Sequence, residues 1–324
     1  MRLRLGFVCG LTMLLVPSAC AQADSLSELI KRGNALDWAG NYSDASRVFR
    51  DAVKQAEEKQ DARLPIALNA LANVEEELAN FADASRLYQR ALTLASKQGK
   101  TTLVYALTLG NLGVHYTANG QSKKAEGMLR ESLAVYQLVE PADSVNLALA
   151  KNALSNLLVD EGRYSEAEEL LLSSLDSYRR HPSTVFGQEA IVLNNLGVVR
   201  REQRRFDEAR DLFEAAARLT ESSLGANHPT LLRALNNVAT VYGLTGHPAE
   251  ADQAFRRSIA IAEERLGPEH PITARVLLNY AGFLRTTGRK AEAKRLEGKA
   301  NTALRDNART NGRGMSVDVS AFRR

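Results

Sequence analysis

The chain has 324 residues, of which 44% are hydrophobic and 25% are charged, and its formal net charge is +4. This composition is ordinary for a globular protein. The small positive charge gives no support to a nucleic-acid partner, because such binding depends on many phosphate contacts from Lys and Arg. The length would usually indicate two domains, although an array of repeats can exceed that limit by adding units.

Residues 1–23 have the pattern of an export signal peptide. Arg2 and Arg4 form a basic start, residues 5–16 form an apolar stretch, and a small-x-small cleavage site ends at Ala23. The apolar stretch is shorter than the roughly 20 residues that a membrane-spanning helix needs, and no later run qualifies, so we expect no transmembrane segment. Cleavage would give a periplasmic or secreted protein, and loss of the two arginines would lower the net charge from +4 to +2.

Cys20 leaves a second possibility open. The three residues that end at Cys20 resemble the end of a bacterial lipoprotein signal, in which this cysteine becomes the lipidated first residue, but Pro17 stands where that signal usually has Leu. Cleavage near Ala23 is therefore our first expectation, and a membrane-anchored lipoprotein is the alternative. Since Cys9 and Cys20 are the only cysteines, we expect the exported chain to have no disulfide and no cysteine nucleophile or metal ligand.

One pattern recurs through the rest of the chain at an interval close to 42 residues. The alanine in the middle of each unit follows the previous one by 39, 41, 42, 42, 42 and 42 residues. These alanines are Ala45, Ala84, Ala125, Ala167, Ala209, Ala251 and Ala293. Twelve residues before each lies another small residue: Gly33, Ala72, Gly113, Ser155, Gly197, Ala239 and Ala281. Small side chains let helix axes approach to about 8–10 Å, and a fixed period of this length indicates stacked repeats.

Each unit is predicted to form a helix, a tight turn and a second helix. Five residues before the central alanine, most units carry a glycine, which suits the left-handed residue that ends a helix. These glycines are Gly40, Gly120, Gly162, Gly246 and Gly288, whereas Ala79 and Arg204 replace them elsewhere. Four residues after the alanine comes a large apolar residue on the same helical face: Phe49, Tyr88, Leu129, Leu171, Phe213 or Phe255. Glu297 takes this place in the last unit, as expected of a terminal repeat whose outer face meets water.

The small-Gly-Ala-Ala columns resemble the tetratricopeptide repeat, and the 42-residue period with the phrase LG-x-x-HP followed by LNN resembles the longer repeats of kinesin light chains. The resemblance covers Ser25 to Asn307 and is strongest in the last three units. It implies an all-α, right-handed α-solenoid, a superhelix of about seven helix-turn-helix units, with a protein or extended peptide held in the concave groove lined by the first helices. We expect the units to span 25–60, 61–100, 101–141, 142–182, 183–225, 226–267 and 268–307, followed by a flexible tail, 308–324.

No residue set in the sequence points to catalysis, a cofactor or a metal. The sequence has no P-loop, no dinucleotide fingerprint, no Gly-x-Ser-x-Gly and no His-Glu-x-x-His. His228 and His270 hold the same place in neighbouring repeats, so they lie on the order of 10 Å apart, whereas zinc ligands lie about 2 Å from the ion. We interpret both as parts of a His-Pro helix start, His115 as a packed or groove residue, and the Glu168-Glu169 pair as a solvated outer face.

Asparagines recur in the middle of the first helices, although Asn is a mediocre helix former. Four lie two residues before the small residue of their unit, and others lie nearby in the remaining units. The groove candidates are Asn111, Asn195, Asn237, Asn279, Asn73 and Asn156. Two compatible interpretations stay open: the amides form a ladder that bonds each repeat to the next, or they hold a peptide backbone with their donor and acceptor atoms.

The densest basic run comprises Arg200, Arg201, Arg204 and Arg205. It is either a solvated helix end, where positive charge is favourable, or a contact for an acidic partner segment, with Arg201 facing the groove. The sequence as a whole predicts a non-catalytic scaffold or adaptor of the bacterial cell envelope that binds a protein or peptide. The alternative is a periplasmic or lipid-anchored assembly factor that uses its convex face or its ends.

Overall fold

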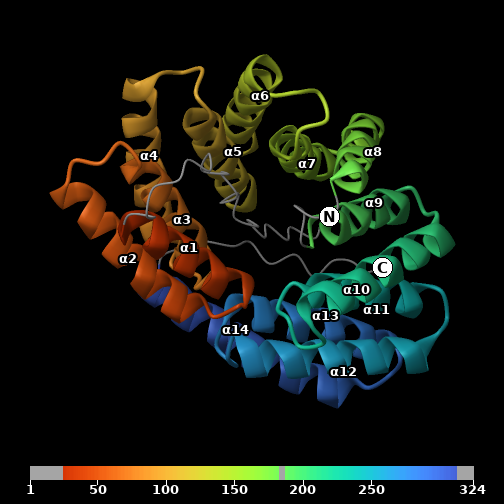
Figure 1. Cartoon of the computed structure of the whole chain (residues 1–324). Helices are drawn as coiled ribbons and strands as arrows, with labels where there is room; N and C mark the ends of the chain where they lie inside the picture. The colour runs from red at the N-terminus through yellow and green to blue at the C-terminus, as the bar shows by residue number, and fades with distance from the viewer. Residues whose placement is uncertain (1–24, 182–186, 312–324) are drawn as a thin grey trace. The chain divides into compact units, whose positions relative to one another are not determined.

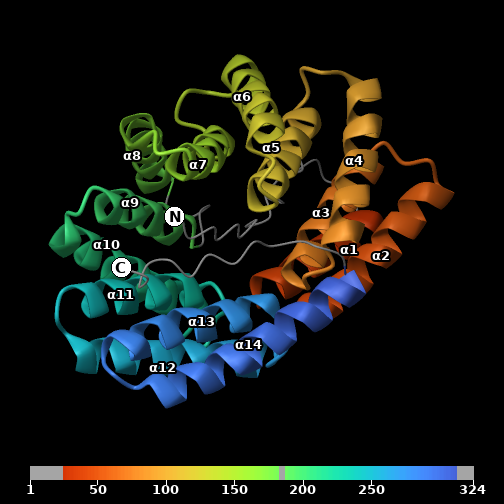
Figure 2. The same ribbon diagram turned by 180° about the vertical axis from the view of Figure 1, so that it is seen from behind.

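The computed structural model describes residues 25–181 and 187–311, which contain fourteen α-helices and no β-strand (Figure 1, Figure 2). The predicted all-α class is confirmed. Within these residues, no helix is both long and apolar enough to cross a membrane. The helices are α1 (Ser25–Trp38), α2 (Tyr42–Glu58), α3 (Leu64–Glu77), α4 (Phe81–Gln98), α5 (Leu103–Ala118), α6 (Ser122–Val139), α7 (Val145–Asp160), α8 (Tyr164–Arg180), α9 (Gln188–Glu202), α10 (Phe206–Leu224), α11 (Leu231–Leu244), α12 (Pro248–Arg265), α13 (Pro271–Thr286) and α14 (Lys290–Asn311).

The chain divides into two compact units, and the division falls between Ala153 and Leu154, inside α7. In the N-terminal unit, the hairpins α1–α2, α3–α4 and α5–α6 stack on one another through α2–α3 and α4–α5. In the C-terminal unit, the hairpins α9–α10, α11–α12 and α13–α14 stack through α10–α11 and α12–α13. The first helices of successive hairpins also touch, α1 with α3, α3 with α5, α9 with α11 and α11 with α13. Each unit is therefore a stretch of α-solenoid built from helix-turn-helix repeats.

The predicted columns of small residues form the contacts inside the hairpins. All seven central alanines, from Ala45 to Ala293, are 0% exposed. The small residue of the first helix faces the large apolar residue of the second helix. A Cβ atom added to Gly33 would lie 2.5 Å from a ring carbon of Phe49, and one added to Gly197 would lie 2.6 Å from a ring carbon of Phe213. Since real Cβ atoms do not approach other atoms this closely, these glycines are required by the packing of an aromatic ring against the backbone.

The turn inside each hairpin has the left-handed conformation that the glycine pattern predicts. The φ angle is 70° at Gly40 and 82° at Gly288. Ala79 and Arg204, which replace the glycine, adopt the same conformation with φ angles of 63° and 61°. For an L-residue other than glycine this conformation costs about 1–2 kcal/mol. The fold therefore keeps the same turn even where the side chain disfavours it.

The C-terminal end differs from the predicted boundary. Helix α14 continues to Asn311, so the segment after residue 307 begins as helix, and the predicted tail at 308 starts too early. Glu297 is half-buried and pairs with Arg285 at 2.6 Å, which suits the polar outer position expected of a last repeat. The expected signal peptide, Cys20 and residues 312–324 lie outside the described residues.

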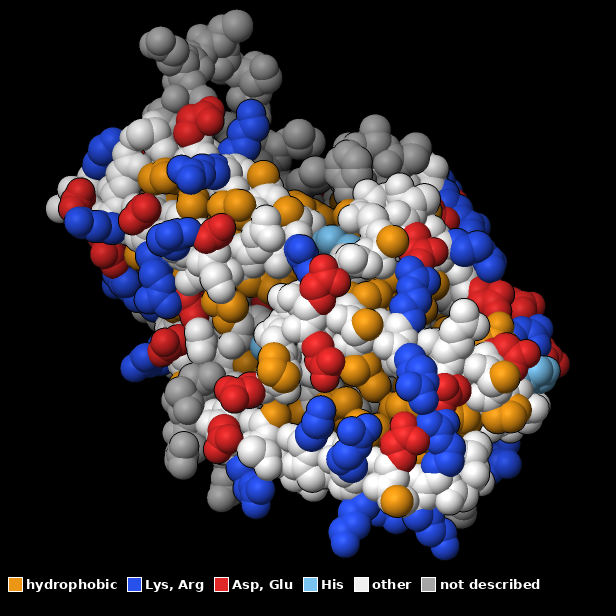
Figure 3. Space-filling view, turned by 90° about the horizontal axis from the view of Figure 1, so that it is seen from below, with side chains coloured by type: hydrophobic (Ala, Val, Ile, Leu, Met, Phe, Trp, Pro, Cys, Tyr) orange, Lys and Arg blue, Asp and Glu red, His pale blue; other side chains and the backbone are white. Residues whose placement is uncertain are grey.

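Figure 3 shows one face of the molecule, on which Lys and Arg side chains are interspersed with Asp and Glu, and apolar side chains lie between them. Many of the surface charges are paired locally, for example Arg130 with Glu126 at 2.9 Å and Arg256 with Asp252 at 2.6 Å. Exposed pairs of this kind contribute about 0–1 kcal/mol each. In Figure 3 itself the two signs of charge are mixed, and neither covers an extended area.

Candidate partner-binding site

Two pairs of asparagines form hydrogen bonds between neighbouring first helices. The Asn111 amide on α5 donates to the side-chain oxygen of Asn69 on α3 at 3.3 Å. The Asn237 amide on α11 donates to the side-chain oxygen of Asn194 on α9 at 2.9 Å. All four side chains are buried. The ladder interpretation therefore describes these two pairs, which we call the closed rungs.

The next pair of equivalent asparagines in the C-terminal unit is not bonded. Asn236 on α11 and Asn279 on α13 occupy the positions of Asn194 and Asn237, one repeat later. The side-chain oxygen of Asn236 and the side-chain nitrogen of Asn279 are buried and have no hydrogen-bond partner. A buried polar atom without a partner is unfavourable by about 1–3 kcal/mol. This pair, which we call the open rung, leaves one buried acceptor and one buried donor unpaired on the first helices.

Three further asparagine candidates lie in different environments. Asn73 on α3 accepts a hydrogen bond from the Tyr88 hydroxyl at 2.6 Å, and its side-chain nitrogen has no partner. Asn195 on α9 is buried and accepts a long contact of 3.5 Å from Asn194. Asn156 on α7 is half-buried. The structure therefore brings Asn237 into a rung and leaves amide groups open at Asn73 and Asn279.

Arg201 is buried and its guanidinium reaches the neighbouring first helix. It donates to the side-chain oxygen of Asn237 at 3.4 Å and forms an ion pair with Glu202 at 2.8 Å. Arg201 thus extends the closed rung of Asn194 and Asn237. The prediction of a solvated helix end is wrong for this residue, because its charge is compensated inside the protein.

Arg200 contradicts the same prediction in a different way. Its guanidinium donates two hydrogen bonds to Glu168 on α8, at 2.7 and 2.5 Å. These hydrogen bonds are the largest cause that lowers the pKa of Glu168. Glu168 is therefore wrongly predicted as solvated outer face, since it joins α8 to the next hairpin. Arg204 and Arg205 are exposed.

His228 and His270 lie at helix starts and His115 is packed, as predicted. The Nδ1 atoms of His228 and His270 each accept a hydrogen bond at 3.2 Å from the backbone N–H two residues later, that of Thr230 or Ile272. The ring of His115 is buried, with Nδ1 3.1 Å from Glu76. The described residues contain no group of three or more His, Cys, Asp or Glu side chains that could hold a metal ion.

Sequence reasoning missed a group of carboxylates in the N-terminal unit. Asp37 on α1 and Glu76 and Glu77 on α3 lie around the buried hydroxyl of Tyr88. Burial and the neighbouring Glu76 and Glu77 raise the pKa of Tyr88 well above its usual value. Burial also raises the pKa of Asp37 to about 7. The available signal was that Asp37 and Glu76 hold equivalent places, each four residues after the small residue of its first helix.

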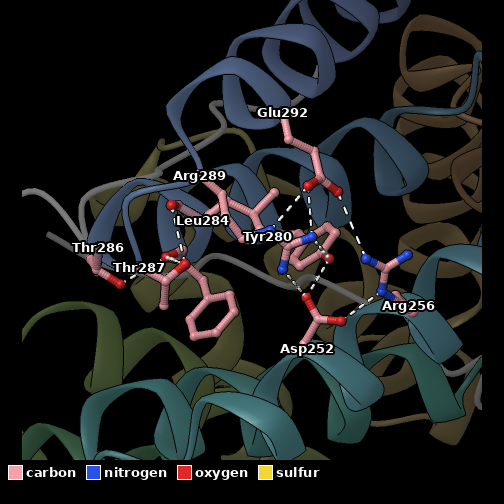
Figure 4. Close-up of polar contacts among 9 residues, drawn as sticks. Asp252, Arg256, Tyr280, Leu284, Thr286, Thr287, Arg289 and Glu292 are labelled. Atoms are coloured by element: carbon pink, nitrogen blue, oxygen red, sulfur yellow. Dashed lines mark hydrogen bonds and ion pairs between the residues drawn. The ribbon is translucent and has the colours of Figure 1, made fainter.

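A polar network joins the last two hairpins (Figure 4). Asp252 on α12 accepts hydrogen bonds from the Tyr280 hydroxyl on α13 and from Arg256, both at 2.6 Å, and also binds Arg289. Burial alone would raise the pKa of Asp252, but these hydrogen bonds outweigh it and lower the pKa to about 2. Glu292 pairs with Arg289 at 2.6 Å. Because every charge in Figure 4 is paired, the network holds the last hairpin in place and offers no free group to a partner.

The profile of the tetratricopeptide repeat matches residues 63–138, 104–180 and 188–264, and a second profile of the same repeat matches 152–223. Together these matches span residues 63–264, more than half of the chain. The chain belongs to the tetratricopeptide repeat family. This family's fold serves as a protein-binding scaffold.

Among known proteins, Kinesin light chain-related 2 of Arabidopsis thaliana is 24% identical over 215 residues, which are 66% of this chain and 31% of that protein. The chain thus spans about a third of the length of this relative.

Two solved structures share the fold. A Rap protein complexed with competence and sporulation factor has a TM-score of 0.61 at 15% identity, covering 88% of this chain and 86% of that chain. The Rap conjugation gene regulator of plasmid pLS20, in complex with a Phr peptide, has a TM-score of 0.55 at 15% identity, covering 81% of this chain and 80% of that chain. At these identities the likeness concerns the fold alone.

Proposed function

We propose that this tetratricopeptide protein is a non-catalytic scaffold that holds an extended segment of a partner protein against its first helices. The observation that carries the proposal is the open rung, Asn236 and Asn279. Its acceptor and donor match the N–H and C=O groups of a peptide backbone, which every extended peptide exposes. Binding would pair two buried polar atoms that have no partner in the protein alone.

The fold is compatible with this role. The Rap structures described above hold competence and sporulation factor and a Phr peptide, and they share with this chain a stack of helical hairpins. For this chain, affinity would come from apolar burial, and the amides would set the direction of the bound backbone. A partner segment that pairs with the open rung would lie across α11 and α13.

A positional-scanning library of acetylated and amidated nonapeptides tests the proposal. In each pool of this library, one position is fixed and the others are mixed. Fluorescence anisotropy with the full chain would identify binding sequences. Replacing both Asn236 and Asn279 by Ala should weaken the best peptide by about tenfold, equivalent to about 1.4 kcal/mol.

Thermal unfolding of the same double variant is the control. The replaced atoms have no partner in the free protein, so the melting temperature should stay the same or rise. Unchanged affinity in the double variant, or no binding by any pool, would refute the proposal.

We further propose that the protein acts in the bacterial cell envelope. The support is the basic, apolar and small-x-small order of residues 1–23. N-terminal sequencing of the protein from cells should give a start at Asp24. Incorporation of labelled palmitate that is lost in Cys20→Ala would instead favour the lipid-anchored assembly factor.

A further inference from the structure

The last helix, α14, carries a row of cations on the side that faces away from its own hairpin. Its buried side chains lie in the core of the last hairpins and are Ala293, Leu296, Ala300 and Ala303. The opposite side of the helix presents five exposed cations, which we call the basic row: Lys290, Lys294, Arg295, Lys299 and Arg305. At a rise of 1.5 Å per residue, the row extends over about 22 Å.

The acidic residues of α14 do not neutralise the basic row. Glu292 pairs with Arg289 at 2.6 Å, in the polar network of Figure 4. Glu297 pairs with Arg285, also at 2.6 Å. The third acid, Asp306, is half-buried. In the part of the chain that the structure describes, no member of the basic row forms an ion pair, so its positive charge is directed to the surroundings of the protein.

The side chains between these cations are small. Ala291, Gly298 and Thr302 follow one another at intervals of seven and four residues, so they lie along the middle of the row. A Cβ atom added to Gly298 would have no side-chain atom within 4 Å except those of the two adjacent residues. The large apolar residues of α14, Leu296 and Leu304, pack in the core. The row therefore lacks the apolar and aromatic anchors that dominate protein–protein interfaces.

The basic row does not suit a second copy of the chain that continues the stack. Lys294 holds on α14 the place that Asp252 holds on α12, 42 residues earlier. Asp252 accepts a hydrogen bond from Tyr280 of the next hairpin. In the first hairpin the place of Tyr280 is taken by Arg32, which is exposed. A second copy stacked on α14 in the same way would bring Arg32 against Lys294, and like charges in contact repel each other.

We propose that the basic row binds the surface of a bilayer that contains anionic phospholipid. Lipid headgroups present negative charge over a flat area, which matches a row of flexible cations with small residues between them. A nucleic acid fits less well, because α14 has no aromatic residue on which a base could stack. Residues 290–324 contain nine Lys and Arg and four Asp and Glu, a net charge of +5, whereas the whole chain has +4.

Flotation of the full chain with two kinds of lipid vesicle tests the proposal. One kind contains phosphatidylcholine alone, and the other also contains phosphatidylglycerol. The measured quantity is the ratio of the two binding constants, because the apolar residues 5–16 would raise both constants alike. The wild type should bind the anionic vesicles at least about a hundredfold more tightly. This ratio should fall as NaCl rises from about 0.1 M to about 1 M, because the Debye length shrinks from about 10 Å to about 3 Å.

Two variants of the basic row separate charge from side-chain geometry. Each Lys or Arg near an anionic surface contributes about fivefold in affinity, so Lys294→Gln with Arg295→Gln should lower the ratio by about 25-fold. Lys294→Arg with Arg295→Lys keeps both charges and should change the ratio by less than about twofold, since headgroup attraction does not require the planar guanidinium. Both side chains are exposed, so the melting temperature should stay the same in each variant.

A matched control removes two exposed arginines from the N-terminal unit. Arg47 on α2 and Arg86 on α4 pair with Asp44 and Asp83. Arg47→Gln with Arg86→Gln changes the net charge as much as the double Gln variant of the basic row does. The ratio should nevertheless stay within about twofold of the wild type.

Each remaining outcome would overturn the proposal. A ratio near one in the wild type, or a ratio that Lys294→Gln with Arg295→Gln leaves unchanged, would show that the row does not bind the bilayer. An equal loss in the control variant would show that only the net charge matters. Tighter binding to single-stranded DNA or to an acidic protein than to the anionic vesicles, lost in the same double variant, would assign the row to another polyanion. The proposed peptide binding depends on Asn236 and Asn279 and would stand in all these cases.

Discussion

The inner polar residues of the two units follow the same repeat positions but are satisfied to different degrees. Four residues after the small residue of the first helix, the N-terminal unit carries Asp37 and Glu76 and the C-terminal unit carries Arg201. Arg201 is bonded to Asn237 and Glu202. Asp37 has no side-chain partner among the described residues, and its pKa is raised to about 7 by burial. The same position of the repeat thus bonds neighbouring repeats through Arg201 and holds a carboxyl with a raised pKa at Asp37.

The largest expected effect concerns the closed rung of the C-terminal unit. Asn237→Ala removes the partner of both Asn194 and Arg201 and leaves them buried, so it should destabilise the protein by about 2–3 kcal/mol. Asn279→Ala, at the equivalent place of the open rung, should change stability by less than about 0.5 kcal/mol. Urea unfolding with hydrogen exchange at α9 and α11 measures both. An equal loss of unfolding free energy in the two variants would show that closed and open rungs do not differ.

The buried carboxyl of Asp37 should make the stability of the protein depend on pH. The pKa of Asp37 is raised from 3.8 to about 7 by burial, so the folded protein keeps a proton that the unfolded chain loses. Stability should therefore fall as the pH rises from about 4 to about 7. Because Asp37 is only half-buried, water reduces the effect to on the order of 2 kcal/mol.

Urea unfolding at pH 5 and pH 8 measures this dependence. Asp37→Asn should be nearly as stable at pH 8 as at pH 5, whereas Asp44→Asn, with an exposed carboxylate in the same unit, should keep the dependence of the wild type. If Asp37→Asn kept the same dependence of stability on pH as the wild type, the Asp37 carboxyl would not be its source.

The smallest effect is expected at the two turns that lack a glycine. Arg204 is exposed, so Arg204→Gly relieves the left-handed conformation and should stabilise the C-terminal unit by about 0.5–1 kcal/mol. Ala79 is 1% exposed, so Ala79→Gly gains the same relief but loses a buried methyl group worth about 0.8 kcal/mol. The net change in the N-terminal unit should be close to zero. Thermal unfolding of both variants measures the two changes in stability. A larger gain in stability for Ala79→Gly than for Arg204→Gly would contradict the packing of the Ala79 methyl group.

The hairpins could be predicted because their contacts are repeated at a fixed interval. Recurrence of the same residue type was enough to predict the buried alanines from Ala45 to Ala293 and the left-handed turns. The pairing of asparagines could not be predicted, because spacing places Asn194, Asn236, Asn237 and Asn279 on the first helices but does not set their side-chain torsions. The sequence therefore left the ladder and the groove open, and the structure contains a closed rung and an open rung.

The carboxylates around the Tyr88 hydroxyl were missed for a different reason. The run Glu75-Glu76-Glu77 looks like a solvated helix end, since charge runs usually are. The three side chains are nevertheless buried, and Asp37 joins them from a helix 39 residues away in the repeat. Arg200 and Glu168 were misjudged in the same manner, because a charge on a helix is indistinguishable in sequence from a charge that bridges two hairpins.

The contact of Gly33 with Phe49, and of Gly197 with Phe213, has a mechanical consequence. Because the aromatic ring packs directly against the backbone of the glycine, the two helices of a hairpin have no space to move relative to each other. Each hairpin should therefore behave as a rigid body. Under tension or torsion, displacement would then occur where hairpins meet, at interfaces that combine apolar packing, such as the cluster that contains Phe213 of α10 and Val241 of α11, with polar contacts such as those of Arg200 and Asn237. The stiffness of the array would then be set by the interfaces between hairpins. A substitution that removes one amide or guanidinium at such an interface should make the array easier to deform.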